Sequence, residues 1–127
     1  MPSALIDTCV LRDYLQGDKR AERALAPYAH KSISVVSWLE LMAQCPGEVL
    51  EPTRGFLRTF ERLSVSESIA DEALRLTQQR PGLPLPRALI WASARLSQLP
   101  FVTADPAHVR ADDSQVVLPY RRKAASG

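Results

Sequence analysis

The chain has 127 residues, of which 46% are hydrophobic and 24% are charged, and its formal net charge is +2. This length fits one domain, and the hydrophobic content excludes a disordered chain because it supplies enough apolar surface for a core. No apolar run approaches the roughly 20 residues that span a bilayer, and the N-terminus lacks the pattern of a secretion signal, so we expect a cytoplasmic protein without membrane contact. The two cysteines, Cys9 and Cys45, show no metal-binding spacing.

The basic side chains are unevenly distributed along the chain. Arg121, Arg122 and Lys123 lie close to the C-terminus, and without them the basic and acidic counts are nearly equal. The net charge therefore does not indicate a nucleic-acid partner. We interpret residues 121–127 as a basic, disordered tail that follows a single domain at residues 1–120. A phosphate-binding role for the tail is the alternative.

Short runs rich in β-branched residues alternate with longer segments of helical periodicity. In chain order, the pattern predicts a strand at 4–6, helices at 10–15 and 19–29, a strand at 33–36, a helix at 38–44, a helix capped by Thr53, a strand at 63–65, a helix capped by Ser66, a helix at 88–96, and strands at 101–103 and 116–118. This alternation predicts an α/β fold of three layers, α/β/α, with a mostly parallel central sheet.

One predicted helix is apolar almost all round. The segment 88–96 carries Leu89, Ile90 and Trp91 among alanines, and prolines at 84 and 86 suit its first turn. We therefore expect this helix to lie buried in the middle of the fold. Asp112 and Asp113 lie in a polar loop and are expected to be solvated; the alternative is that one of them approaches a functional site from the side of the fourth strand.

Three acids follow predicted strands. Asp7 comes directly after the first strand, Glu40 lies one helical turn after the second, and Asp105 lies just past the fourth. In parallel strands these positions meet at one edge of the sheet, where open α/β sheets place ligand crevices. Carboxylates brought together repel one another and need a cation or shared protons. A divalent metal ion with oxygen ligands, used for phosphodiester hydrolysis, satisfies this need.

Each acid also has a purely structural interpretation. Asp7 can cap the helix that follows it, and Asp105 before Pro106 has the form of a helix N-cap with proline at the first position. Ser37 and Glu40 match a capping box, in which the glutamate bonds back to the cap. Taken one at a time, each acid is explained by these roles, so only their shared edge favours a site.

Residues 5–11 read LIDTCVL. This run resembles LIDTNVL, the opening of PIN domains, especially of the VapC toxins of VapBC toxin–antitoxin pairs. The later blocks of the family are matched, in order, by SVVSWLEL at 34–41, LPLPRALIWASA at 83–94, LPFVTAD at 99–105 and VVLPY at 116–120. The match spans nearly the whole chain in the right order, which makes it specific for the fold.

The resemblance implies a nuclease site built on four acids. In the family these acids bind Mg²⁺ or Mn²⁺, and a metal-activated water hydrolyses RNA. Asp7, Glu40 and Asp105 match the first, second and fourth positions, and are thereby assigned as catalytic and metal-binding residues. Arg87 stands at the third position, where the family has aspartate. Cys9 replaces the asparagine usual beside the first acid, and Thr103 lies next to the site.

The resemblance also implies partners. VapC-like toxins act on RNA, form homodimers, and are held by an antitoxin whose C-terminal segment places a basic side chain in the acidic cleft. Arg87 adds a positive charge beside the acids of that cleft, and three placements of its side chain are open. Its guanidinium can pair inward with the acids, which we expect, or point to solvent and leave a three-acid metal site, or hold an RNA phosphate.

Two functional hypotheses follow from the substitution at position 87. The first is a metal-dependent endoribonuclease of the VapC type, impaired because Arg87 replaces the third acid. The second is a catalytically inactive PIN-fold module that binds RNA or protein. Binding of Mg²⁺ or Mn²⁺ distinguishes them, since only the first requires the ion.

Overall fold

The computed structural model describes residues 2–122. The strands are β1 (Ser3–Ile6), β2 (His30–Ser34), β3 (Glu61–Leu63), β4 (Phe101–Val102) and β5 (Val116–Val117). The helices are α1 (Thr8–Leu15), α2 (Lys19–Leu25), α3 (Val35–Ala43), α4 (Leu50–Leu57), α5 (Glu67–Gln79) and α6 (Leu85–Leu96), with a 3-10 turn, η1, at Gly47–Val49. In the part of the chain described, no helix is both long and apolar enough to cross a membrane.

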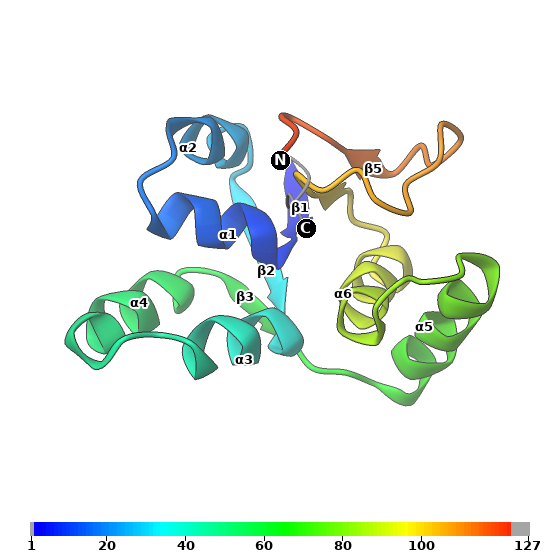
Figure 1. The fold of residues 1–127 in the computed structure, drawn as a ribbon, viewed down its shortest axis with the longest axis horizontal. Coiled ribbons are helices and arrows are strands. Elements are labelled where there is room, and N and C mark those ends of the chain that lie inside the picture. The colour runs from blue at the N-terminus through cyan, green and yellow to red at the C-terminus, as the bar shows by residue number, and fades with distance from the viewer. Residues whose placement is uncertain (1, 123–127) are drawn as a thin grey trace.

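The five strands form one sheet in the order β3-β2-β1-β4-β5, and each neighbouring pair is parallel. Helices α1 to α4 lie on one side of this sheet, and α5 and α6 lie on the other (Figure 1). The side chains of β1 alternate between two cores: Ala4 and Ile6 belong to one apolar cluster, and Leu5 belongs to the other. The predicted three-layer α/β fold with a parallel sheet is confirmed.

Helix α6 supplies much of the core on its side of the sheet. Ile90 and Trp91 are each 1% exposed, and the Trp91 ring stacks on Phe101 of β4 with 5.6 Å between the centroids. Helix α5 packs along α6 and covers its other side. The central position predicted for this helix is confirmed, although its C-terminal residue, Leu96, is exposed.

The boundary between β2 and α3 differs from the sequence prediction. Val35 and Val36, whose branched side chains favour strands, form the first turn of α3. The Ser34 hydroxyl caps this helix by accepting a hydrogen bond from the Val36 amide, at 3.0 Å. Ser37 therefore lies inside the helix, and the predicted capping box from Ser37 to Glu40 is wrong.

Of the two N-caps predicted for α4 and α5, one is wrong and the other is confirmed. Helix α4 begins at Leu50, before Thr53, which is a buried residue within the helix, so the predicted Thr53 cap is wrong. Pro52 lies in the first turn of α4, where a missing amide hydrogen costs nothing. The predicted Ser66 cap of α5 is confirmed, since its hydroxyl accepts from the Ile69 amide at 3.2 Å.

Of the predicted tail at 121–127, the structure describes Arg121 and Arg122, and residues 123–127 lie outside the described residues. The Arg122 amide donates to the Ala104 carbonyl at 2.8 Å, and its Nε lies 3.3 Å from a carboxylate oxygen of Asp13 on α1. The Tyr120 hydroxyl donates to the other oxygen of Asp13, at 2.7 Å. These contacts join the segment after β5 to α1.

Candidate functional site

Asp7 connects β1 to α1 at the C-terminal edge of the sheet. Its side chain accepts from the Thr8 amide at 2.8 Å, so it caps α1 as the structural interpretation predicted. The residue is 4% exposed. A buried carboxylate is costly unless it is hydrogen-bonded, and the second oxygen of Asp7 accepts from Cys9, Arg87 and Thr103.

Thr103, which follows β4, connects these donors. Its hydroxyl donates to the Asp7 carboxylate at 2.7 Å, and the same oxygen accepts from Arg87 Nη2 at 3.1 Å and from the Asp105 amide at 3.2 Å. One hydroxyl offers one donor and two acceptor sites, so these three bonds use its full capacity. Thr103 is fully buried and thereby fixes the separation between the carboxylate and the guanidinium.

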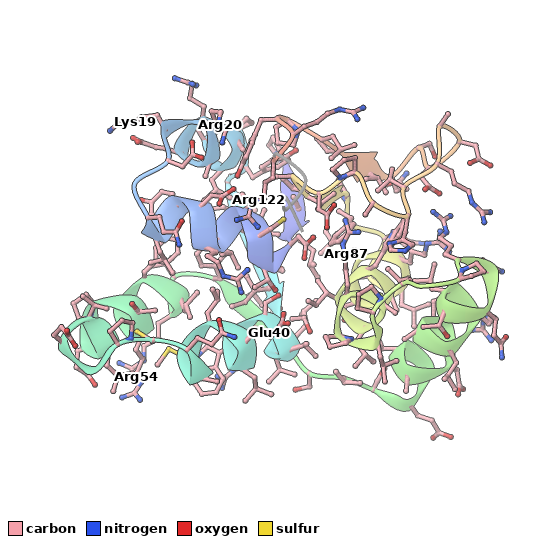
Figure 2. All side chains as sticks on the ribbon, viewed as in Figure 1. Lys19, Arg20, Glu40, Arg54, Arg87 and Arg122 are labelled. Atoms are coloured by element: carbon pink, nitrogen blue, oxygen red, sulfur yellow. The ribbon has the colours of Figure 1, made fainter. Side chains whose placement is uncertain are left out.

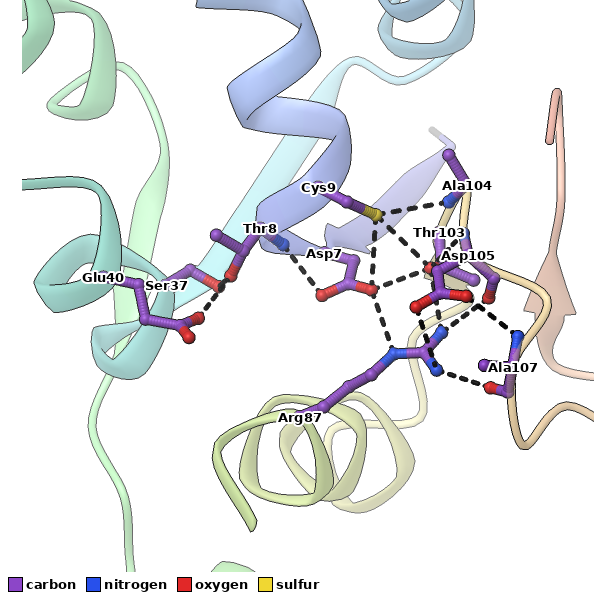
Figure 3. A network of polar contacts seen from close by, with 10 residues as sticks. All are labelled: Asp7, Thr8, Cys9, Ser37, Glu40, Arg87, Thr103, Ala104, Asp105 and Ala107. Atoms are coloured by element: carbon purple, nitrogen blue, oxygen red, sulfur yellow. Dashed lines mark hydrogen bonds and ion pairs between the residues drawn. The ribbon is translucent and has the colours of Figure 1, made fainter. Parts of the chain in front are cut away.

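Arg87 lies in the first turn of α6 and points into the cleft (Figures 2 and 3). Its Nε is 3.4 Å from Asp7 Oδ2, and only 11% of its side chain is exposed. Its terminal nitrogens donate to the backbone carbonyls of Asp105 and Ala107, at 2.7 and 2.5 Å. The expected inward pairing of Arg87 is therefore confirmed for Asp7.

Asp105 lies beyond Thr103 at the mouth of the cleft, with 46% of its side chain exposed. One oxygen accepts from the Ala107 amide at 2.9 Å, and the other is 3.8 Å from Arg87 Nη1. No helix follows it, so the predicted N-cap with Pro106 at the first helical position is wrong; the side chain closes a turn instead.

Glu40, on α3, is the acid that stands apart. Its carboxylate accepts from the Thr8 hydroxyl at 2.9 Å, and that hydroxyl also lies 2.8 Å from Ser37 Oγ. Figure 3 shows Glu40 on the opposite side of Asp7 from Arg87. All three predicted acids, together with Cys9 and Arg87, still line one cleft of about 230 Å³.

Cys9 is the second residue of α1 and lies beside the buried oxygen of Asp7. Its Sγ is 3.6 Å from Asp7 Oδ2 and 3.6 Å from Thr103 Oγ1, and it accepts from the Ala104 amide at 3.4 Å. Burial, with the negative charge of Asp7, raises the pKa of the Cys9 thiol to about 11. The thiol is thus protonated at neutral pH and acts as a weak donor to the carboxylate.

The side chains of the cleft are not arranged as ligands of a divalent metal ion. Asp7 is satisfied by protein hydrogens on both oxygens, and the Arg87 guanidinium lies between it and Asp105. Within residues 2–122, no three His, Cys, Asp or Glu side chains are close enough together to hold a metal ion. As arranged here, the residues do not fit Mg²⁺ or Mn²⁺, because a protein cation takes the place between the acids.

A second buried ion pair was not predicted. Asp113, expected to be solvated, pairs with Arg80 at the end of α5, and each side chain is 6% exposed. Arg80 also donates to the His108 carbonyl at 2.8 Å, and this pairing holds the pKa of Asp113 below its usual range. The pair anchors the loop from β4 to β5, which carries Asp105 and Ala107. Its partners lie 33 positions apart, and no local pattern in the sequence marks them.

Comparisons with known proteins agree with this architecture. The model of the PIN domain family matches residues 4–114. A toxin–antitoxin complex from Klebsiella pneumoniae contains a chain with 33% identity and a TM-score of 0.86, over 94% of this chain and 99% of that one. None of the curated proteins is significantly similar in sequence.

Two further solved structures share the fold at lower identity. FitAcB from Neisseria gonorrhoeae has 20% identity and a TM-score of 0.75, over 91% of this chain and 97% of that one. DNA-bound VapBC from Salmonella typhimurium has 20% identity and a TM-score of 0.71, over 92% and 98% of the two chains.

Proposed function

The chain belongs to the PIN-domain family, and from this premise we propose that it is the VapC-like component of a toxin–antitoxin pair in which Arg87 suppresses metal-dependent RNA hydrolysis. One observation carries the proposal: the guanidinium lies against the buried carboxylate of Asp7, 3.4 Å away, and reaches toward Asp105. The fold and the acidic edge of a nuclease-type domain are retained, while the cation between the acids belongs to the chain itself.

The guanidinium reproduces only part of what a metal ion does. It neutralises carboxylate charge and donates directed hydrogen bonds, which keeps the cleft folded. It has no vacant coordination position, so it cannot lower the pKa of a bound water as a divalent cation does. Arg87 therefore supports the structure of the acidic edge without supporting hydrolysis.

Binding of an antitoxin is the function that this arrangement preserves. A groove of about 500 Å³ between α1, α3 and η1–α4 is lined by apolar side chains that include Leu15, Leu41 and Val49. It adjoins the cleft, since Arg12 and Glu40 line both. We propose that an antitoxin segment occupies this groove. A homodimer, implied by the resemblance, is checked by light scattering of the purified protein.

An impaired ribonuclease is the second candidate. The observation that favours it is that Asp7, Glu40 and Asp105 line the same cleft despite Arg87. A rearrangement that turns the guanidinium outward would leave three carboxylates for Mg²⁺ or Mn²⁺, with RNA as the substrate.

Melting in the presence of metal separates the two candidates. Parent protein and Arg87→Asp are melted with EDTA or with Mn²⁺, and Arg75→Asp serves as a control of equal charge change on the exposed face of α5. We expect Mn²⁺ to raise the melting temperature of Arg87→Asp and to leave parent and control unchanged. A large Mn²⁺ shift in the parent that Asp7→Asn removes would establish the ribonuclease instead.

Growth of a bacterial host gives an independent test. Expression of the parent without any antitoxin should be tolerated, because the cleft is already neutralised. Growth arrest that Asp7→Asn abolishes would contradict the proposal. Co-expression with the product of a small adjacent gene, followed by co-purification, checks the antitoxin partner.

A further inference from the structure

A second polar pocket lies on the face formed by α3, α4 and β3. It encloses about 400 Å³ and is lined by Trp38, Arg54, Leu57, Arg58, Phe60 and Arg62. Half of these side chains are arginines, and none is acidic. No lining residue is shared with the cleft that contains Asp7. β3 is the edge strand of the sheet, and β2 separates it from β1.

The alternation of β3 explains why Arg62 faces this pocket. Arg62 is paired in register with Ile33 of β2, and Ile33 packs in the apolar cluster on the side of α1 to α4. Leu63, the next residue, packs in the cluster on the opposite side. Glu61 shares the face of Leu63, so its carboxylate is directed away from the arginines.

Trp38 holds Arg62 in a defined orientation. The guanidinium carbon lies 4.7 Å from the centroid of the indole ring. Stacking engages the face of the guanidinium and leaves the N–H groups at its edge free to donate. Leu57 and Phe60, which are 2% and 6% exposed, form an apolar floor that strengthens any polar contact made above it.

The positive charge of this pocket is only partly balanced. Arg54 is paired with Glu51, 2.9 Å away. Among residues 2–122, no carboxylate lies within ion-pair distance of Arg58 or Arg62. Two guanidiniums that share a small concave site repel one another unless an anion lies between them.

We propose that this pocket binds a phosphate group of a single-stranded RNA chain, at a site separate from the Asp7 cleft. Guanidinium forks match the oxygens of phosphate, and arginines combined with an aromatic ring are typical of grooves that follow a nucleic-acid backbone. The carboxylate of an acidic protein segment can also accept from two guanidiniums, so competition by poly-glutamate is included in the test below. The inference does not depend on whether the Asp7 cleft is active.

The test is titration of a fluorescein-labelled single-stranded RNA of about ten nucleotides, followed by anisotropy, with EDTA present so that no metal-dependent cleavage occurs. The double variant Arg58→Gln/Arg62→Gln is compared with the parent. Arg23→Gln/Arg75→Gln loses the same charge at exposed positions outside the pocket and is the matched control. Thermal melting verifies that all three proteins are folded.

We expect the double variant to bind RNA about tenfold or more weakly than the parent, and the control to bind within about twofold of it. The slope of log affinity against log salt should fall by about 0.7, since the pocket holds one phosphate and each phosphate contact with a single strand contributes about 0.7. Arg62→Lys, which keeps the charge and loses the fork, should fall between parent and double variant.

Three results would overturn the proposal. The parent does not bind the RNA, or the double variant binds it like the parent, or the control loses as much affinity as the double variant. Displacement of the RNA by poly-glutamate as effectively as by unlabelled RNA would assign the pocket to acidic protein segments instead. None of these outcomes alters the metal-dependent melting that tests the proposed function.

Discussion

Replacement of Arg87 by alanine removes the one cation that, among residues 2–122, contacts the buried carboxylate of Asp7. The two side chains are 11% and 5% exposed. Breaking a buried ion pair from one side typically costs about 3–5 kcal/mol, because the remaining charge is left without its partner. Asp7 keeps its donors on Thr8 and Thr103, so we expect the lower end, about 3 kcal/mol. For a domain of this size, that loss corresponds to a fall in melting temperature of about 10 °C.

The assay is a double-mutant cycle measured by urea denaturation in EDTA. Arg87→Ala, Asp7→Asn and the double variant are compared with the parent, which isolates the coupling between the two side chains. We expect a coupling of about 1.5–3 kcal/mol, as for hydrogen bonds between charged groups. Arg87→Lys is the control for charge alone, because it keeps a cation but cannot donate to both backbone carbonyls.

An Arg87→Ala variant that melts within about 2 °C of the parent would contradict a stabilising role for this ion pair. A coupling with Asp7 below about 0.5 kcal/mol would contradict it equally, since the stability lost would then come from the contacts with Ala107 and Asp105. A coupling that appears only when Mn²⁺ is present would show that the metal, not the arginine, balances Asp7.

Three further predictions concern other parts of the fold. Ile90→Ala, at a position 1% exposed in α6, should destabilise the protein by about 3 kcal/mol in urea, and a parent-like denaturation midpoint would contradict the central role of this helix. Pairing with Arg80 lowers the pKa of Asp113 in the folded state. The stability that this ion pair contributes is therefore present above the unfolded pKa near 3.9, and it is lost as the pH falls through the lower pKa of the folded state. Asp113→Asn should therefore lower the melting temperature at pH 7 and flatten its dependence below pH 4; an unchanged profile would exclude this linkage. At pH 8 a thiol reagent should modify Cys45 and spare Cys9, whose buried thiol has a pKa of about 11, and equal rates for both in the native protein would refute that assignment.

The sequence was sufficient to predict the acidic edge because its geometry follows from a parallel sheet. Asp7 and Asp105 come after neighbouring strands β1 and β4, and parallel strands end on the same side. The inward direction of Arg87 could be expected for the same reason, since α6 begins beside these acids. Glu40 was harder to place, because two residues expected in β2 belong to α3, and its carboxylate contacts Thr8 instead of the arginine.

Other features depend on contacts that no local pattern encodes. The carbonyl of Ala107, an acceptor for Arg87, is a backbone group and has no residue signature. The pair between Arg80 and Asp113 forms only when the loop from β4 to β5 folds over the end of α5. The polar composition of that loop predicted that Asp112 and Asp113 are solvated. Asp112 is exposed as predicted, whereas tertiary packing buries the side chain of Asp113.

Arg87 is covalently attached to α6, so the positive charge in the cleft does not vary with the concentration of metal ions in the cell. A cation drawn from solution occupies an acidic cleft only in proportion to its supply, and chelation empties the cleft. A guanidinium fixed to the same chain is present at a constant effective concentration, whatever the supply of ions. We therefore expect the folded population of this protein to be independent of metal supply, and we expect an acid at position 87 to make it depend on that supply.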